Sequence, residues 1–516
     1  MKRILYILFL VFVTRTADAQ PFKTEISETF ADNIGDPVLQ MSNGFTVFRH
    51  LDDNKTFVTI LGKRHEKMVY NKLVEIDFKK DKIKNWLEIN NKPTLVIQRK
   101  GENSFFLITI DPQTGEKISE EAGGNGKDLF IDSETGNIAT LNINSRSLHK
   151  DEAESKKDFN DITTASIVIY DPSFKKIQEK EFDFMDHRYQ DVNKYDVIFK
   201  NNTVYILWGL RKIIDRESYD HPKTKDIFFS TYDLKTKQFN HKQMLAMDHP
   251  CNARMYMNDK GTDCYTRFIV HTETTGGGLK DITHVYESFV IPVNPITLEI
   301  YKSFSVPSEK TDDFIKINCK KDESVSGSFV YDCSVDAKGN LNITRITNST
   351  PGYEDWYYGP SMEVFSSRIC IVGVSTIDKT GKEIGAWAFP SFNSGYDNGN
   401  NSPLFSGTDN KANFDFSFVG SSTGPLVFFD ERQENYNIPL DQERKESKWL
   451  KDCTTIVAAY VNGAVTEYSV FGDSGNNNLY ADFHNSLYDA KTKTIVVKVY
   501  DGPGYKKSRA AWIKIE

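Results

Sequence analysis

The densest group of side chains that could recognise a ligand lies in one aromatic segment, residues 352–360 (GYEDWYYGP). Tyr and Trp offer large flat faces with a polar handle, so they anchor protein interfaces and can stack on the ring of a sugar. The flanking Gly and Pro are typical of a loop. We therefore predict a ligand-binding loop, although the same rings could instead pack over the rim of the fold. Its candidate residues are Tyr353, Glu354, Asp355, Trp356, Tyr357 and Tyr358.

A second polar segment follows at residues 391–406 (SFNSGYDNGNNSPLFS). Its Asn393, Tyr396 and Asp397 could share a face with the aromatic loop, and long loops on a rigid scaffold often carry function. The high Asn and Gly content is equally that of a flexible loop tip. We expect these three residues to extend the ligand site.

No motif of a common catalytic class is present. The sequence has no GxSxG nucleophile motif, no P-loop and no strand–GxGxxG–helix unit. Glycoside hydrolysis needs two acids at a fixed separation, but 72 acidic residues single out no pair. Glu354 and Asp355 beside Trp356 are the most suggestive acids. Catalytic residues are therefore unknown, and a glycoside hydrolase is the alternative to a binding protein.

Metal chemistry has little support in the sequence. The ten histidines are scattered, and no Cys/His spacing typical of zinc occurs. Oxygen-rich segments at residues 132–137, 397–401 and 472–478 could hold calcium, but Asp, Asn and Gly are also the residues that turns favour. We expect no metal site and no cofactor, with structural calcium as the alternative.

The elements that would position these loops are β-hairpins that recur along the chain. Clear copies occupy residues 106–120, 167–182, 228–241 and 374–389, with looser ones at 72–89, 289–306 and 456–471. Each has an apolar strand, an Asp or Asn turn and an amphipathic strand. The turn residues Asp111, Asp171, Asp233 and Asn294 are 60, 62 and 61 residues apart. Self-similarity at such a period indicates a repeat architecture.

A second hairpin type alternates with the first, for example at residues 129–141, 197–210 and 334–346. Two hairpins make one four-stranded blade, so we predict an all-β fold, a single β-propeller of about eight blades. Seven is the alternative, because residues 93–121 look short of a full blade. Residues 509–516 read as a strand without a partner, and residues 24–30 could pair with it and close the ring.

The N-terminus has the features of a secretory signal. Lys2 and Arg3 precede an apolar run at residues 4–13, and Ala17-Asp18-Ala19 fits a cleavage site. We predict a signal peptide at residues 1–19 and a propeller domain at residues 20–516. The protein would be exported to the periplasm, the cell surface or beyond, without membrane insertion of the mature chain, because no later apolar run could span a bilayer.

The exported compartment permits disulfides, and the chain has six cysteines. Local spacing favours Cys251 with Cys264 and Cys319 with Cys333, because each pair flanks a polar, hairpin-like segment. The thiols could equally be buried as small hydrophobic side chains.

The formal net charge of −8 and mixed-charge runs such as residues 150–161 argue against nucleic acid as a partner. The chain resembles the secreted β-propeller proteins of Bacteroidota-type bacteria, in its Ala-Asp-Ala-Gln signal end and its Tyr-Asp-Pro and Ile-Asp-Pro hairpins. That resemblance implies a fold and carries over no catalytic residues. We expect a monomeric, non-catalytic module that binds an envelope protein or a glycan.

Overall fold

The structure is a computed structural model. It describes residues 20–52, 55–76, 80–126, 128–144, 164–182, 189–212, 225–247, 251–275, 282–326, 329–349, 365–397, 417–421, 424–445, 453–472, 479–501 and 507–516. The signal peptide at residues 1–19 lies outside these ranges and remains a prediction from the sequence.

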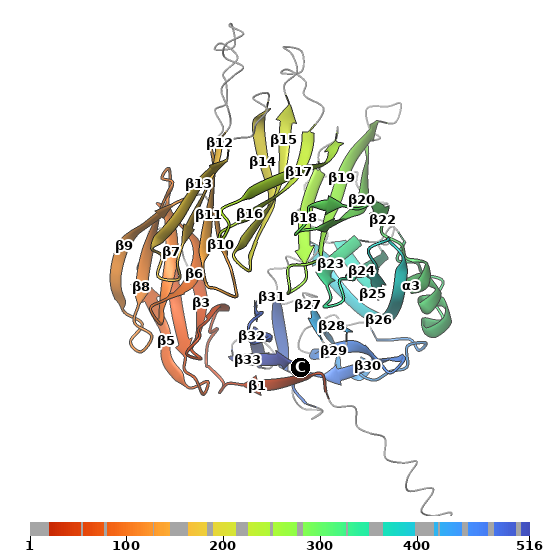
Figure 1. Cartoon of the computed structure of the whole chain (residues 1–516). Helices are drawn as coiled ribbons and strands as arrows, with labels where there is room; N and C mark the ends of the chain where they lie inside the picture. Colours follow the sequence, from red (N-terminus) through yellow and green to blue (C-terminus); the bar gives the residue numbers. More distant parts are fainter. Residues whose placement is uncertain are drawn as a thin grey trace, which may run out of the picture.

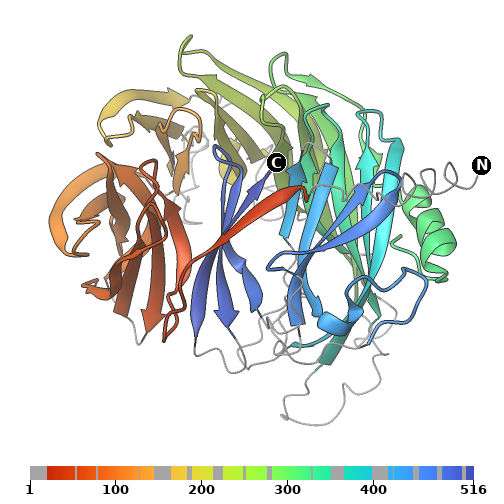
Figure 2. The same cartoon turned by 90° about the horizontal axis from the view of Figure 1, so that it is seen from below.

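Eight antiparallel sheets are arranged in a ring, which confirms the predicted eight-bladed β-propeller (Figures 1 and 2). Residues 93–121 lie within a complete four-stranded blade, so the seven-bladed alternative is wrong. The first four blades contain the following strands. Blade 1 has β2 (Asp36–Gln40), β3 (Thr46–Asp52), β4 (Lys55–Leu61) and β5 (Lys67–Val74); blade 2 has β6 (Asp81–Ile89), β7 (Lys92–Arg99), β8 (Ser104–Ile110) and β9 (Lys117–Asn125); blade 3 has β10 (Asp128–Ile131), β11 (Ile138–Asn144), β12 (Thr164–Tyr170) and β13 (Lys176–Phe182); blade 4 has β14 (Tyr189–Lys200), β15 (Thr203–Lys212), β16 (Lys225–Asp233) and β17 (Phe239–Met247).

The last four blades follow the same order, and blade 8 is completed from the N-terminus. Blade 5 has β18 (Cys251–Met257), β19 (Cys264–Thr275), β20 (Ile282–Asn294), β21 (Glu299–Ile300) and β22 (Phe304–Ser305); blade 6 has β23 (Phe329–Val335), β24 (Leu341–Ser349), β25 (Phe365–Ile377) and β26 (Glu383–Asp397); blade 7 has β27 (Ser417–Ser421), β28 (Gly424–Arg432), β29 (Cys453–Val461) and β30 (Ala464–Ser469); blade 8 has β31 (Leu479–Asp489), β32 (Thr494–Asp501), β33 (Ser508–Ile515) and β1 (Phe22–Ile26).

The first strands of neighbouring blades contact one another and form the inner wall of the ring. Because the strands are antiparallel, the connections from first to second and from third to fourth strand lie on one face of the ring, here called the turn face. The remaining connections lie on the opposite face, the loop face. Hydrophobic cores fill the space between blades; one cluster joins Phe428 of blade 7 to Ile513 and Phe22 of blade 8.

The Asp and Asn residues that recur along the sequence do occupy equivalent turns on the turn face. The Asp111 carboxylate accepts hydrogen bonds from the backbone N–H of Gln113 (2.8 Å) and Thr114 (2.9 Å). Asp171, Asp233, Asn294 and Asp378 accept the same bond from the residue two positions later. These backbone donors lower the pKa of Asp111 because they stabilise its ionised form. The repeat is therefore a repeat of side-chain-capped turns.

The predicted ring closure is confirmed. β1 pairs with β33 from Phe22↔Ile515 to Ile26↔Ala511, so the N-terminus supplies the fourth strand of blade 8. The ammonium of Lys498 on β32 lies 2.7 Å from the Asp36 carboxylate of blade 1 and 3.0 Å from that of Asp482 on β31. The strand pairing and this buried ionic cluster join the two ends of the chain.

The looser hairpin predicted at residues 72–89 is wrong. Those residues run from the last strand of blade 1 to the first strand of blade 2, which belong to different sheets. Between blades 5 and 6 the chain forms a short helix, α3 (Glu309–Phe314), followed by a π-helical turn, η2 (Ile315–Cys319); a 3₁₀ turn, η3 (Gln433–Asn435), follows β28. None of the helices in the described ranges is long and apolar enough to cross a membrane.

The predicted disulfides are also wrong, since Cys251, Cys264, Cys319 and Cys333 are free thiols. Cys251 pairs with Val270 at one end of the β18–β19 ladder, while Cys264 lies at the other end. Six residues of extended strand separate them, roughly 20 Å, whereas a disulfide needs Cα atoms within about 7 Å. Cys319 and Cys333 are buried in different hydrophobic clusters. The alternative, buried thiols that act as small hydrophobic groups, fits the structure.

Replacing Lys498 by Met is expected to lower the free energy of unfolding by about 3 kcal/mol, because it leaves two carboxylates without their cation in a poorly hydrated site. Urea unfolding followed by fluorescence measures this. The matched control is Lys445→Met, which removes an exposed ion pair with Glu434 and should cost about 1 kcal/mol or less. Equal losses in the two variants would contradict the structural role of Lys498.

Because the five described cysteines are free thiols, we expect that a reductant leaves the thermal midpoint of unfolding unchanged. Burial raises the pKa of Cys333 to about 12 and that of Cys319 to about 11, so little reactive thiolate forms at neutral pH. Thiol titration should give slow labelling of the native protein, and denaturation without reductant should expose all five described cysteines. An intact mass lower by two hydrogen atoms for each predicted cysteine pair would show disulfides and contradict the free thiols.

Candidate functional site

The aromatic loop predicted from the sequence, with Tyr353, Glu354, Asp355, Trp356, Tyr357 and Tyr358, lies outside the described residues. The three polar residues predicted to follow in a loop do not lie in one. The backbone of Asn393, Tyr396 and Asp397 belongs to β26, where it pairs with Ile369, Ser366 and Phe365 of β25. Their side chains are outside the described part, so a role in binding remains a prediction.

Within the described residues, a large cleft opens on the turn face where blades 5 to 8 meet, with a cavity volume of about 840 Å³. The inner strands β18, β23, β27 and β31 form its channel side, and it continues outward between blades 6 and 7. Its lining combines aromatic, aliphatic and polar side chains. These are Met255, Tyr256, Met257, Asp259, Cys333, Ser334, Val335, Asp336, Ala337, Lys338, Asn342, Thr376, Gly385, Ala386, Trp387, Val419, Gly420, Ser421, Gly424, Pro425, Tyr460, Tyr488 and Lys493.

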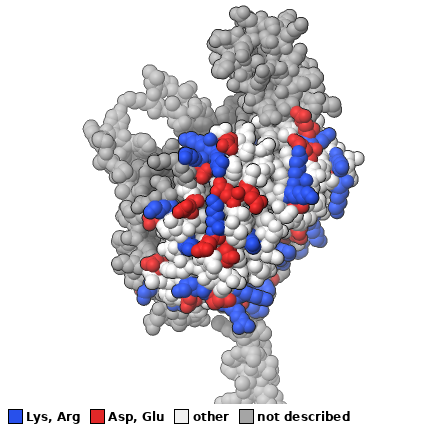
Figure 3. Space-filling model, turned by 90° about the vertical axis from the view of Figure 1, so that its left-hand side faces the viewer, with Lys and Arg blue, Asp and Glu red and all other residues white. Residues whose placement is uncertain are grey.

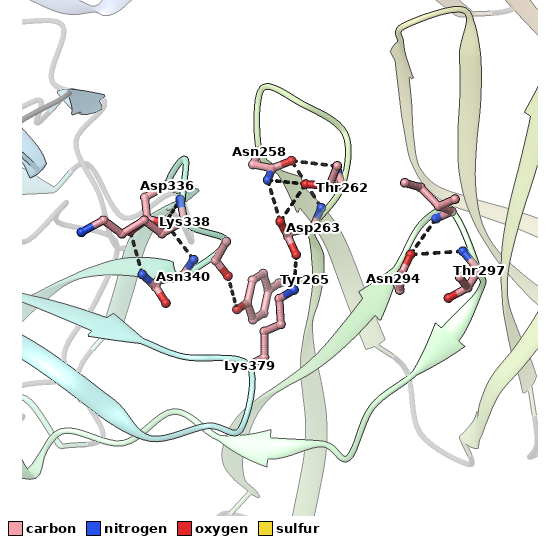
Figure 4. A network of polar contacts seen from close by, with 12 residues as sticks. Asn258, Thr262, Asp263, Tyr265, Asn294, Thr297, Asp336, Lys338, Asn340 and Lys379 are labelled. Atoms are coloured by element: carbon pink, nitrogen blue, oxygen red, sulfur yellow. Dashed lines mark hydrogen bonds and ion pairs between the residues drawn. The ribbon is translucent and has the colours of Figure 1, made fainter.

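A network of polar contacts fixes the rim of the cleft where blades 5 and 6 meet (Figure 4). The Asn258 amide donates to the Asp263 carboxylate (2.8 Å), and that carboxylate forms an ion pair with Lys379 of blade 6. The Tyr265 hydroxyl, fully buried, donates to the Gly339 carbonyl (2.7 Å) in the β23–β24 turn. The turns of the two blades therefore hold each other in place, and the cleft has a rigid border.

Aromatic rings form the floor and the rim of the cleft. Trp387 is buried and stacks on Phe389, with ring centroids 5.8 Å apart. Tyr460 and Tyr488 are 38% and 45% exposed. Partial burial, followed by the charges of Asp259 and Asp489, raises the pKa of Tyr488. Tyr488 therefore offers a neutral phenol to a ligand, and Tyr460 adds a second partly exposed ring.

Small residues keep the cleft open. A Cβ at Gly420 would meet only the Ser334 hydroxyl, at 3.9 Å, and one at Gly424 would meet no atom within 4 Å. The Ser334 hydroxyl is buried and has no hydrogen-bond partner within the described part of the chain. A larger side chain at Gly420 would occupy the space in front of that hydroxyl.

The carboxylates around the cleft serve the fold. Asp336 accepts hydrogen bonds from the backbone N–H of Lys338 and Asn340, both 2.8 Å, and closes the β23–β24 turn. Asp259 lies 3.3 Å from the Lys200 ammonium of blade 4. Beside the cleft, burial raises the pKa of Asp332 to about 6, against the lowering effect of its hydrogen bond from the Cys333 N–H. Each of these three carboxylates therefore has a structural partner within the described part of the chain.

A cluster of buried charges holds a loop-face connection. Arg444 is 5% exposed and lies between Glu467 (2.6 Å) and Glu431 (3.6 Å). Burial raises the pKa of Glu431, while Arg444 and the Asn435 amide act in the opposite direction. This cluster attaches the connection between β28 and β29 to blade 7.

No group of three or more His, Cys, Asp or Glu side chains could hold a metal ion within the described ranges. In the oxygen-rich turn at residues 132–137, the Asp132 carboxylate accepts from the Thr135 hydroxyl and from the backbone N–H of Glu134 and Asn202. These donors occupy both carboxylate oxygens, and Asn202 belongs to blade 4. The turn thus joins two blades. Calcium at the other two segments remains untested.

Comparison with known proteins identifies no function. No protein-family model matches the chain, and no curated protein sequence is similar to it. Among solved structures, dipeptidyl peptidase 4 of Porphyromonas gingivalis is 12% identical with a TM-score of 0.40, and the match covers 92% of this chain and 58% of that one. A prolyl endopeptidase is 10% identical with a TM-score of 0.38, covering 91% and 54%. An oligogalacturonate lyase from Vibrio parahaemolyticus is 10% identical with a TM-score of 0.33, covering 80% and 91%. The chain thus spans little more than half of the peptidases it matches.

Asp332→Asn should make stability less sensitive to pH. The folded pKa of about 6 lies above the unfolded value of about 3.9. The protonated carboxyl is therefore the form that the native state favours. The stability that this preference contributes is fully present below the unfolded pKa and is lost as the pH rises through about 6. The variant should gain about 1.4 kcal/mol over the parent between pH 5 and pH 8, measured by urea unfolding, because pH 5 lies one unit below the folded pKa of about 6. Asp259→Asn, at a largely exposed carboxylate, is the control. A stability difference between Asp332→Asn and the parent that is the same at pH 5 and pH 8 would contradict the prediction.

Proposed function

We propose that the protein is a binding module and that the turn-face cleft where blades 5 to 8 meet holds a neutral oligosaccharide. The observation that carries this proposal is the pair of exposed tyrosines, Tyr460 and Tyr488, on the rim of a cavity of about 840 Å³. Ligand sites combine such concave, partly aromatic surfaces with a few polar groups that fix orientation. An aromatic face is electron-rich and suits the polarised C–H groups of a sugar.

The polar groups of the cleft favour a ligand rich in hydroxyls. The buried Ser334 hydroxyl lacks a partner in the described part, and a hydroxyl of the ligand would satisfy it. The Asn342 carbonyl oxygen accepts from the Thr376 hydroxyl (2.8 Å), which orients both groups in the wall. An unpaired buried polar group costs about 1–3 kcal/mol, so filling this site with a matching hydroxyl stabilises the complex.

The charges of the cleft favour a neutral ligand. Its charged lining residues are two acids, Asp259 and Asp336, and two lysines, Lys338 and Lys493. Equal numbers of opposite charges give no net field that would select an ionic ligand. If the signal-like segment at residues 1–19 directs export, the ligand would be a glycan of the envelope or of the surroundings; an envelope protein is the second partner predicted from the sequence.

Tyr488→Ala should weaken binding of the best ligand in a panel of neutral tri- and tetrasaccharides about tenfold, or ~1.4 kcal/mol, through loss of one stacking surface. Gly420→Trp should abolish binding because the indole fills the cavity. Isothermal titration calorimetry measures both effects. Ile177→Trp, a similarly bulky change at a 53% exposed position of blade 3, should bind like the parent. Equal affinities in all three variants, or no binding by the parent, would contradict the proposal, and cleavage of a bound sugar would favour the hydrolase.

A further inference from the structure

A second pocket, of about 880 Å³, lies on the opposite, loop face of the ring, where blades 1 to 3 meet. It is formed by the end of β3, the start of β6, the connection between β7 and β8 and the first residue of β10. The turn-face cleft is formed by other blades and by opposite strand ends, so the two cavities are independent.

The lining of this pocket is cationic, although the chain has a net charge of −8. Six cations and three carboxylates contribute to it. The cations are Arg49, Lys80, Lys82, Lys84, Arg99 and Lys100, and the carboxylates are Asp81, Glu102 and Asp128. On the neighbouring outer side of blades 1 and 2, Lys/Arg and Asp/Glu side chains are interspersed (Figure 3). The excess of positive charge is therefore a property of the pocket.

Two of the three carboxylates already have cationic partners. Asp128 forms an ion pair with Lys194 of blade 4, and Asp81 lies 3.9 Å from Arg99. Arg99 is held by stacking on the Phe106 ring, 3.8 Å from its centroid. Its guanidinium is thus fixed at the wall, with part of its surface directed to solvent.

Arg49, Lys82 and Lys100 keep donor groups available within the described part of the chain. The Nε–H of Arg49 is buried and meets no acceptor in the described part of the chain. A buried cationic donor without an acceptor is costly, and an anion entering the pocket would supply one. Lys82 and Lys100 are exposed, and neither has an ion pair or a side-chain hydrogen bond in the same described ranges.

Like charges crowd together on the channel side of the pocket. Lys82 and Lys84 are two residues apart at the start of β6, where a register shift between Ile83 and Asn85 interrupts the ladder with β7 at Lys84. Burial lowers the pKa of Lys84, Asp128 opposes this, and the charges of Lys82 and Lys194 lower it further. A bound anion would relieve this repulsion.

We propose that this pocket binds a polyvalent small-molecule anion, one that carries two or more phosphate or carboxylate groups. Arg49 binds one anionic group at depth, and Lys82 and Lys100 bind another at the entrance. The arrangement suits a compact anion, because its cations come from three short segments around one cavity. This site is independent of the proposed oligosaccharide cleft, so either proposal can fail alone.

The test is isothermal titration of the full chain with tripolyphosphate and with citrate at 50 mM NaCl, which separates the phosphate from the carboxylate source. We expect binding of at least one of them, weakened about tenfold in Arg49→Gln and several-fold in Lys82→Gln. Lys242→Gln, an exposed cation on β17 of blade 4, is the charge-matched control and should bind like the parent. A rise in salt to 300 mM should weaken the interaction.

Thermal midpoints without ligand check that the variants fold. If Arg49→Gln fails to fold, Lys82→Gln and Lys100→Gln carry the test, because neither side chain has an ion pair or hydrogen bond in the described part of the chain. The proposal is overturned if the parent binds neither anion, or if the lysine variants and Lys242→Gln bind equally well. Gly420→Trp in the turn-face cleft should leave anion binding unchanged.

Discussion

The structure depends on one pairing, that of β1 with β33. Without it, blade 8 would consist of three strands, and the backbone donors and acceptors of β33 would form an exposed edge. The pairing runs over five residues on each strand. It is supported by Trp512, whose ring lies 3.6 Å from that of His65 in blade 1 and whose indole N–H donates to Thr46.

The two faces of the ring have different properties. On the turn face, tight turns capped by Asp or Asn hold neighbouring blades together; the N–H of Asn202 in blade 4 donates to Asp132 in blade 3 (2.8 Å). The loop face carries the longer connections, one of them held by the buried Arg444. The proposed ligands differ accordingly. A charge-balanced aromatic cleft suits a neutral sugar, and a pocket with excess lysine and arginine suits an anion.

The sequence predicted those features that depend on neighbouring residues. Asp111 caps its own hairpin, so the turn and its repetition along the chain could be predicted from the sequence. The terminal strand without a partner likewise predicted ring closure. The disulfides failed because the spacing of Cys251 and Cys264 does not tell at which end of a ladder each lies. Neither cavity was predicted. Arg49 and Lys82 come from different blades, and the ring brings them together without any local pattern.

Amide hydrogen exchange of the full chain, read by mass spectrometry of peptides, tests the closed ring most directly. If β1 is the fourth strand of blade 8, residues 22–26 should exchange about as slowly as β5, the fourth strand of blade 1, because both are edge strands whose backbone hydrogen bonds join one neighbour. The inner strand β32 gives the reference for a strand paired on both sides. Exchange of residues 22–26 at the rate of an unstructured terminus, with β32 protected, would contradict ring closure by the β1–β33 pairing.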